Sequence, residues 1–80
     1  MAGPTNRRHE RPTLHAELAA ILQAAGNPWM TTRELADQVN ARGRYTKRDG
    51  SPVTGYQVHG RTKNYPHIFE RDGSRVRLRS

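Results

Sequence analysis

Apolar positions recur at helical spacing between residues 13 and 26. They fall at i, i+4, i+7, i+8 and i+11, which makes one apolar face: Leu14, Leu18, Ile21, Leu22 and Ala25. Thr13 is a favourable N-cap, and Gly26 is a typical C-terminal stop. The pattern therefore predicts a core helix from Leu14 to about Ala25, with His15 and Glu17 pointing outward into solvent.

The next segment, "NPWMTTRELADQVNARG", carries the strongest local signal in the chain. Thr31 followed three residues later by Glu34 predicts a capping box, and Met30 is placed to pack against Leu35. A second helix is expected from Thr32 to Gly43, with its apolar residues inward: Leu35, Ala36 and Val39. The sequence context of residues 28–30 favours an extended backbone, and these residues are expected to form a brief strand.

The same capping device recurs in "VTGYQVHGRTKNYPHIF" at residues 53–69. Thr54 is followed three residues later by Gln57, and Val53 and Val58 stand in the hydrophobic-staple positions. A third helix is expected from Gly55 to about Asn64, since Pro66 prevents continuation. Its inward stripe is narrow, with only Val58, Thr62 and Tyr65. The polar residues on its outer side are Gln57, Arg61, Lys63 and Asn64.

The last segment, "IFERDGSRVRL", reads as two strands around Asp72-Gly73, a strong type I′ hairpin signal. Pairing about that turn sets Phe69 opposite Val76 and Glu70 opposite Arg75. One face of the hairpin then carries apolar residues: Phe69, Val76 and Leu78. The other face carries charged residues: Glu70, Arg75 and Arg77.

The chain of 80 residues has the size of one small domain, and its net charge of +7 favours a polyanionic partner. The charge is uneven. Residues 1–12 carry three Arg and one acid, residues 13–43 two Arg and three acids, and residues 44–80 nine basic and three acidic side chains. The positive excess is therefore concentrated on the third helix, the loop before it and the hairpin.

Other chemistries find little support in the sequence. The absence of cysteine excludes disulfides and thiolate metal sites and favours an intracellular, cytoplasmic location. The four histidines, at positions 9, 15, 59 and 67, lack the spacing of a zinc site, and no nucleophile and base stand together. No apolar run is long enough for a membrane span. We expect no enzyme, no metal, no cofactor and no membrane partner.

Element order predicts an α+β fold, a winged helix-turn-helix of three helices and a two-stranded hairpin over residues 13–79. Residues 1–12 are expected to be a flexible basic arm. The third helix would enter the major groove of double-stranded DNA, and the hairpin would be the wing. We expect a monomer. The candidate DNA-binding residues are Thr54, Tyr56, Gln57, His59, Arg61, Lys63, Asn64, Arg71, Ser74, Arg75 and Arg77, with Arg44, Lys47 and Arg48 in the preceding loop.

That loop departs from the usual pattern, because residues 42–53 far exceed the three or four residues of a helix-turn-helix turn. Asp49-Gly50 predicts a tight turn inside it. Two roles stay open for the loop: contact with the DNA backbone beside the groove, or a connector. Trp29 and Tyr65 are expected to pack at the core or its rim, since each adjoins a core stripe.

Several segments resemble the HARE-type helix-turn-helix, a winged-helix domain. They are "LHAELAAILQAAGNPWMTTRELADQVNARGRY", "DGSPV", "NYPHIF" and "ERDGSRVRL", which together span about residues 13–79. The resemblance implies DNA binding, a role in sensing methylated bases, and a larger parent protein of the restriction or chromatin type. Two alternatives are a protein-docking module, in which the same face meets an acidic protein surface, and RNA binding, which the scarcity of exposed aromatic residues disfavours.

Overall fold

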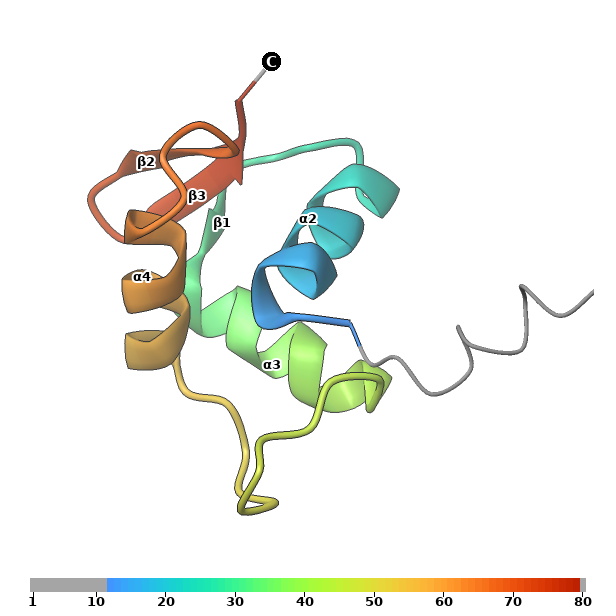
Figure 1. The fold of residues 1–80 in the computed structure, drawn as a ribbon. Coiled ribbons are helices and arrows are strands. Elements are labelled where there is room, and N and C mark those ends of the chain that lie inside the picture. The colour runs from blue at the N-terminus through green and yellow to red at the C-terminus, as the bar shows by residue number, and fades with distance from the viewer. Residues whose placement is uncertain (1–11, 80) are drawn as a thin grey trace, which may run out of the picture.

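The computed structural model of the protein describes residues 12–79, so the expected basic arm lies outside the described residues apart from Pro12. Within the described part the chain forms three helices and a three-stranded antiparallel sheet (Figure 1). In chain order the elements are α2 (Leu14–Ala24), β1 (Met30–Thr31), α3 (Thr32–Arg42), α4 (Gly55–Lys63), β2 (Phe69–Asp72) and β3 (Arg75–Leu78). The fold is thus a small α+β domain, as predicted.

The helix boundaries follow from their caps. Thr31 accepts a hydrogen bond from the Glu34 N–H through its hydroxyl, and the Thr31 N–H donates to the Glu34 carboxylate. Thr54 and Gln57 make the same reciprocal pair at the start of α4. At the end of α3, Gly43 takes a left-handed conformation with φ of 67°, which favours glycine. The predicted starts of all three helices are confirmed.

The sheet has the order β1-β3-β2, with β3 in the centre. Met30 pairs with Val76 and Thr31 with Arg75, so the short strand predicted before the second helix exists. It is confined to Met30 and Thr31, and residues 28 and 29 lie outside it. This strand ties the beginning of α3 to the hairpin, because the Thr32 N–H also donates to the Ser74 carbonyl at 2.8 Å.

The predicted pairing of the hairpin is wrong. Phe69 pairs with Leu78 and Asp72 with Arg75, so the two loop residues are Gly73 and Ser74. Gly73 has a φ of 64°, whereas Ser74 does not have a positive φ, which fits a type II′ turn with glycine first. The pairing differs by two residues, and side chains alternate with a period of two. Phe69, Val76 and Leu78 therefore still share one face.

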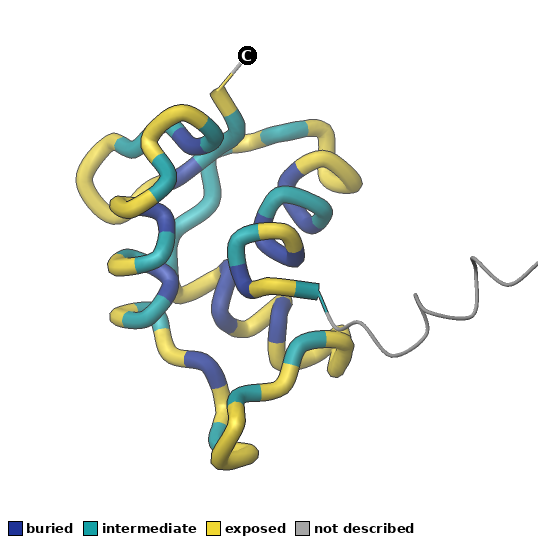
Figure 2. Tube along the Cα trace, viewed as in Figure 1, coloured by how far each residue is buried: buried dark blue, intermediate teal, exposed yellow. Residues whose placement is uncertain are grey.

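The core is formed by residues from every helix and from β2 and β3 (Figure 2). Its buried apolar members are Leu14, Leu18, Ile21, Leu22, Leu35, Ala36, Val39, Val53, Val58, Phe69 and Val76. Val53 and Val58, predicted as a hydrophobic staple, are both buried. Ala25 is exposed, contrary to the prediction, because it is the C-cap and lies past the last residue of α2.

Glu17 and His15 do not point into solvent as expected. Glu17 is only 2% exposed, and its carboxylate accepts a hydrogen bond from the Arg42 guanidinium at the end of α3. His15 is half-buried and stacks on Tyr65, with ring centroids 4.0 Å apart. Both residues lie at the margins of the apolar stripe of α2, where neighbouring elements cover them.

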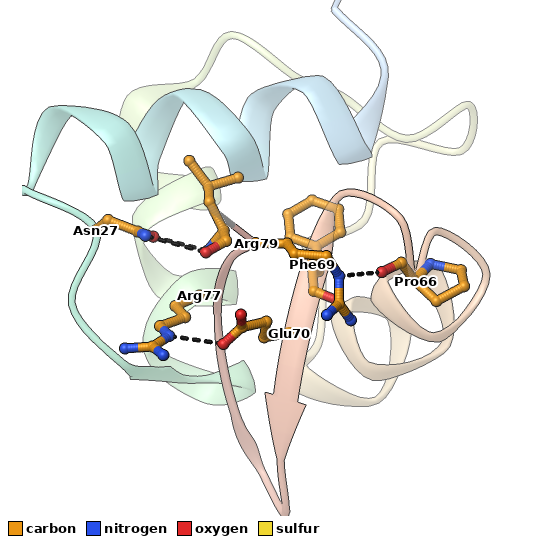
Figure 3. A network of polar contacts seen from close by, with 7 residues as sticks. Asn27, Pro66, Phe69, Glu70, Arg77 and Arg79 are labelled. Atoms are coloured by element: carbon orange, nitrogen blue, oxygen red, sulfur yellow. Dashed lines mark hydrogen bonds and ion pairs between the residues drawn. The ribbon is translucent and has the colours of Figure 1, made fainter.

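Two asparagine side chains hold connecting segments in place. Each one bonds to both the N–H and the carbonyl of a single residue, as a neighbouring strand would. The Asn27 side chain donates to the Leu78 carbonyl and accepts from the Leu78 N–H, which holds the α2–β1 connection against the end of β3 (Figure 3). Asn40 makes the same pair of bonds to the backbone of Val53, each 2.9 Å long. The end of the long loop is therefore tied to α3 immediately before α4 begins.

Replacing Arg42 by Leu leaves the Glu17 carboxylate buried without its cation. Breaking a buried ion pair costs about 3–5 kcal/mol, and the effect is smaller where one partner is partly exposed. The Arg42 side chain is 30% exposed, so we expect Arg42→Leu to lower the free energy of unfolding by about 2 kcal/mol. Urea unfolding measures this. The double variant Glu17→Leu/Arg42→Leu should recover most of the loss, and a double variant less stable than Arg42→Leu would contradict the account.

Candidate nucleic-acid interface

Helix α4 lies at the edge of the molecule, between the β2–β3 hairpin and the loop of residues 43–54 (Figure 1). It packs against α2, α3 and β2. Only Val58 and Thr62 of the helix are fully buried, and the Thr62 hydroxyl donates to the Val58 carbonyl at 3.0 Å. The narrow inward stripe predicted for this helix is confirmed, and most of its surface faces away from the core.

The outer side of α4 and its C-cap carries side chains that the fold does not use. Tyr56 is 86% exposed, the one large apolar residue among the described positions to be so placed. Arg61, Lys63 and Asn64 make no side-chain hydrogen bond or ion pair with residues 12–79. Lys63 and Asn64 are exposed, whereas Arg61 is half-buried on the flank of the helix that borders the loop. Gly60 lies opposite Val58, because two residues turn a helix by about 200°. These positions form a face of about one helix length that is open to a partner.

Thr54 and Gln57, both candidate DNA contacts, are engaged at the start of the helix. The Gln57 Oε1 accepts from the Thr54 N–H at 3.0 Å, and the Thr54 hydroxyl accepts from the Gln57 N–H at 3.3 Å. A paired contact with adenine needs both the oxygen and the nitrogen of the Gln57 amide. The capping box uses the amide oxygen of Gln57 and leaves only the amide nitrogen free. Gln57 can therefore make the predicted pair of hydrogen bonds to adenine only if the capping box breaks.

His59 and Arg71 meet each other between α4 and β2. The Arg71 Nη2 lies 2.8 Å from Nδ1 and 3.0 Å from Nε2 of His59, and both residues are half-buried. Arg71 pairs with Val76 in the hairpin, and so it projects from the face that packs on the helix. These two candidates brace the hairpin against α4, which restricts their reach toward a ligand.

The hairpin keeps Arg75 as its exposed cation. Arg77 already has partners, because its Nε donates to the Glu70 carboxylate at 2.9 Å (Figure 3). Its guanidinium also lies 4.4 Å from the centre of the Trp29 ring. Ser74 is exposed in the turn. Tyr65 packs against the core, as predicted. Trp29 is half-buried, and its ring contacts the Arg77 guanidinium and is not among the residues packed on the core.

The loop before α4 contains the tight turn predicted at Asp49-Gly50. The Gly50 N–H donates to the Lys47 carbonyl at 3.0 Å, which closes it. The Ser51 N–H and hydroxyl both donate to the Asp49 carboxylate, and these bonds lower the pKa of Asp49 below its usual value. Arg44 and Arg48 are exposed, and Lys47 is half-buried. The internal bonds shape the loop into a defined turn beside α4.

A pocket of about 290 Å³ opens between α4, this loop and the start of α2. Its walls come from Leu14, Tyr45, Lys47, Val53, Tyr56, Gln57, Gly60, Arg61 and Asn64. The sequence pattern did not predict it, because these residues belong to three segments that only the fold brings together. Its lining combines two tyrosines, two cations and two amides with a few aliphatic side chains.

The remaining cations of this region lie on α4, on the loop before it and on the hairpin. Six basic side chains on the loop, the helix and the hairpin make neither an ion pair nor a side-chain hydrogen bond within the described part of the chain: Arg44, Lys47, Arg48, Arg61, Lys63 and Arg75. The neighbouring Arg71 and Arg77 are held by His59 and Glu70. The arrangement favours binding of an extended polyanion over the helix and its two flanks.

Metal and membrane chemistry have no visible site in the described region. No group of three or more His, Cys, Asp or Glu side chains between residues 12 and 79 is arranged to hold a metal ion. No helix there has the length and apolar character needed to cross a membrane. Comparisons of the chain with known protein families, with curated proteins and with solved structures gave no match. The site itself is therefore the basis for a functional assignment.

Proposed function

We propose that the chain is a double-stranded DNA-binding module of the winged-helix type. Helix α4 enters the major groove, and the β2–β3 hairpin lies beside it as the wing. The observation that carries the proposal is the exposed side of α4, where Tyr56 and Lys63 extend without partners, with half-buried Arg61 unpaired on the flank of the helix, while only two residues of the helix are fully buried. The major groove is wide enough for an α-helix and exposes base edges that such side chains read.

The arrangement of elements supports the same proposal. Helix, strand, helix, helix, strand, strand is the order of a winged helix, and β1 pairs with the hairpin to complete a small sheet. The longer connection between α3 and α4 is a departure from a tight helix-turn-helix. In this proposal its exposed cations, Arg44 and Arg48, contact phosphates on one flank of the groove, and Arg75 does so on the other.

The side chains divide into two groups. Arg61 and Lys63 donate to phosphate oxygens or to guanine, and Asn64, whose amide is unused, can pair with adenine. His59 and Arg71 instead fix the angle between the helix and the wing, since they already contact each other. Exposed Tyr56 also suits a protein interface, where tyrosine is enriched. Docking to an acidic protein surface is therefore the alternative, and such a complex would survive nuclease treatment.

Replacing Arg61 and Lys63 together by Ala should weaken duplex binding and its dependence on salt. Each phosphate contact contributes about 0.9 to the slope of log K against log salt, so the loss of two lowers the slope by about 2. Fluorescence anisotropy at several salt concentrations measures both quantities. The charge-matched control is Arg7→Ala/Arg8→Ala, in the N-terminal segment. Equal losses from the two pairs of changes would count against α4 as the groove-binding element.

The resemblance to HARE-type domains adds a narrower hypothesis, that the module senses base methylation on behalf of further domains of a parent protein. Methyl groups on cytosine or adenine project into the major groove, where α4 is proposed to lie. We expect affinity to differ between duplexes of one sequence with and without 5-methylcytosine or N6-methyladenine. Identical dissociation constants across all three duplexes would remove this hypothesis and leave general duplex binding in place.

A further inference from the structure

Gly60 is a costly residue for its position. Glycine inside a helix is less favourable than alanine, because it loses more backbone conformational freedom on folding. Four other glycines of the described region have positive φ angles that favour glycine: Gly26, Gly43, Gly50 and Gly73. At Gly55 a Cβ would lie 3.3 Å from the backbone nitrogen of Arg33, so close packing accounts for it. At Gly60 a Cβ would meet nothing within 4 Å.

Neither backbone conformation nor packing within residues 12–79 therefore requires a glycine at position 60. A remaining physical reason is close approach of a ligand to the helix backbone, which a side chain would obstruct. Gly60 lines the pocket between α4 and the loop, and it lies on the outer face of the helix. The glycine thus marks the place where the proposed DNA-binding face and the pocket meet.

The pocket has the chemistry of a site for a planar, hydrogen-bonding ring that carries an anion. Tyr45 and Tyr56 supply aromatic surfaces, and Lys47 and Arg61 supply positive charge. The amide nitrogen of Gln57, which the capping box leaves unused, and the Asn64 amide supply polar contacts. A volume of about 290 Å³ falls just below the range of drug-sized ligand pockets, about 300–1,000 Å³, which suits a small ring.

We propose that this pocket receives a single nucleobase, with its phosphate, turned out of the DNA that α4 binds. The base stacks on tyrosine and lies against the helix backbone at Gly60. The Gln57 and Asn64 amides bond to its edge, and Lys47 and Arg61 hold the phosphate. Proteins that capture extruded bases use this combination of stacking and edge contacts. The inference rests on the proposed function, and it adds a site that groove binding alone does not need.

Extrusion of a base costs a few kcal/mol when the base is stacked and paired, and least when it is unpaired. The protein should therefore prefer a duplex with one unpaired nucleotide over the same duplex fully matched. Each 1.4 kcal/mol that extrusion no longer consumes raises affinity tenfold. We expect the bulged duplex to bind roughly ten times more tightly or better, by competition against a labelled matched duplex.

Two variants test the site from different segments. Gly60→Leu fills the pocket, and it should fold at least as well as the natural chain because it removes a helix glycine. Tyr45→Leu removes an aromatic wall from the loop while keeping an apolar contact with the core. Both variants should bind the bulged and the matched duplex with about equal affinity. Lys63→Ala, outside the pocket lining, should weaken both duplexes and keep their ratio. Circular dichroism and urea unfolding verify the fold of each variant.

The outcomes separate the pocket from the proposed function. Equal affinity of the natural chain for both duplexes, or a preference that persists in Gly60→Leu and Tyr45→Leu, overturns the pocket proposal and leaves groove binding intact. A free deoxynucleoside monophosphate that competes as well as the bulged duplex overturns it too, because the ligand is then a free nucleotide. Failure to bind either duplex overturns both proposals.

Discussion

The position of α4 depends on a narrow buried stripe packed against α3, α2 and β2, and on polar contacts at the start and side of the helix. Nine residues form a helix that is unstable alone, and only Val58 and Thr62 are fully buried along it. The hydrogen bonds between the Asn40 side chain and the Val53 backbone fix the direction in which the loop enters α4. The capping box fixes the first turn of the helix. The contact of Arg71 with His59 braces its side. The remaining surface is left open for a partner.

Features that depend on local sequence were predictable. The three N-caps, both capping boxes and the α+β element order follow from short-range patterns, and the structure confirms them. The apolar face of α2 was also predicted, since Leu14, Leu18, Ile21 and Leu22 are buried at helical spacing. The hairpin faces were right although the pairing was not, because an error of two residues preserves the alternation of side chains.

Features that depend on contacts between distant segments were missed. Glu17 was expected outside because it lies off the apolar stripe of α2, yet Arg42, 25 residues later, provides the partner that permits burial. Arg77 and Arg71 looked like free cations until the fold placed Glu70, Trp29 and His59 beside them. The pocket belongs to the same class. An acidic residue next to an apolar stripe, such as Glu17, can indicate a buried ion pair. The cation that pairs with it lies too far along the chain for a local pattern to identify.

The most direct measurement is a titration of isotope-labelled protein with a short DNA duplex, followed through backbone amide shifts at about 0.1 M salt, where surface charges are only partly screened. The account predicts that the largest shifts fall in α4 and its C-cap, residues 55–64, and at residues 70–77 of the hairpin, with smaller ones in the loop before the helix. Shifts centred on the exposed faces of α2 and α3, or no shifts at saturating duplex, would contradict the proposal that α4 is the DNA-binding element.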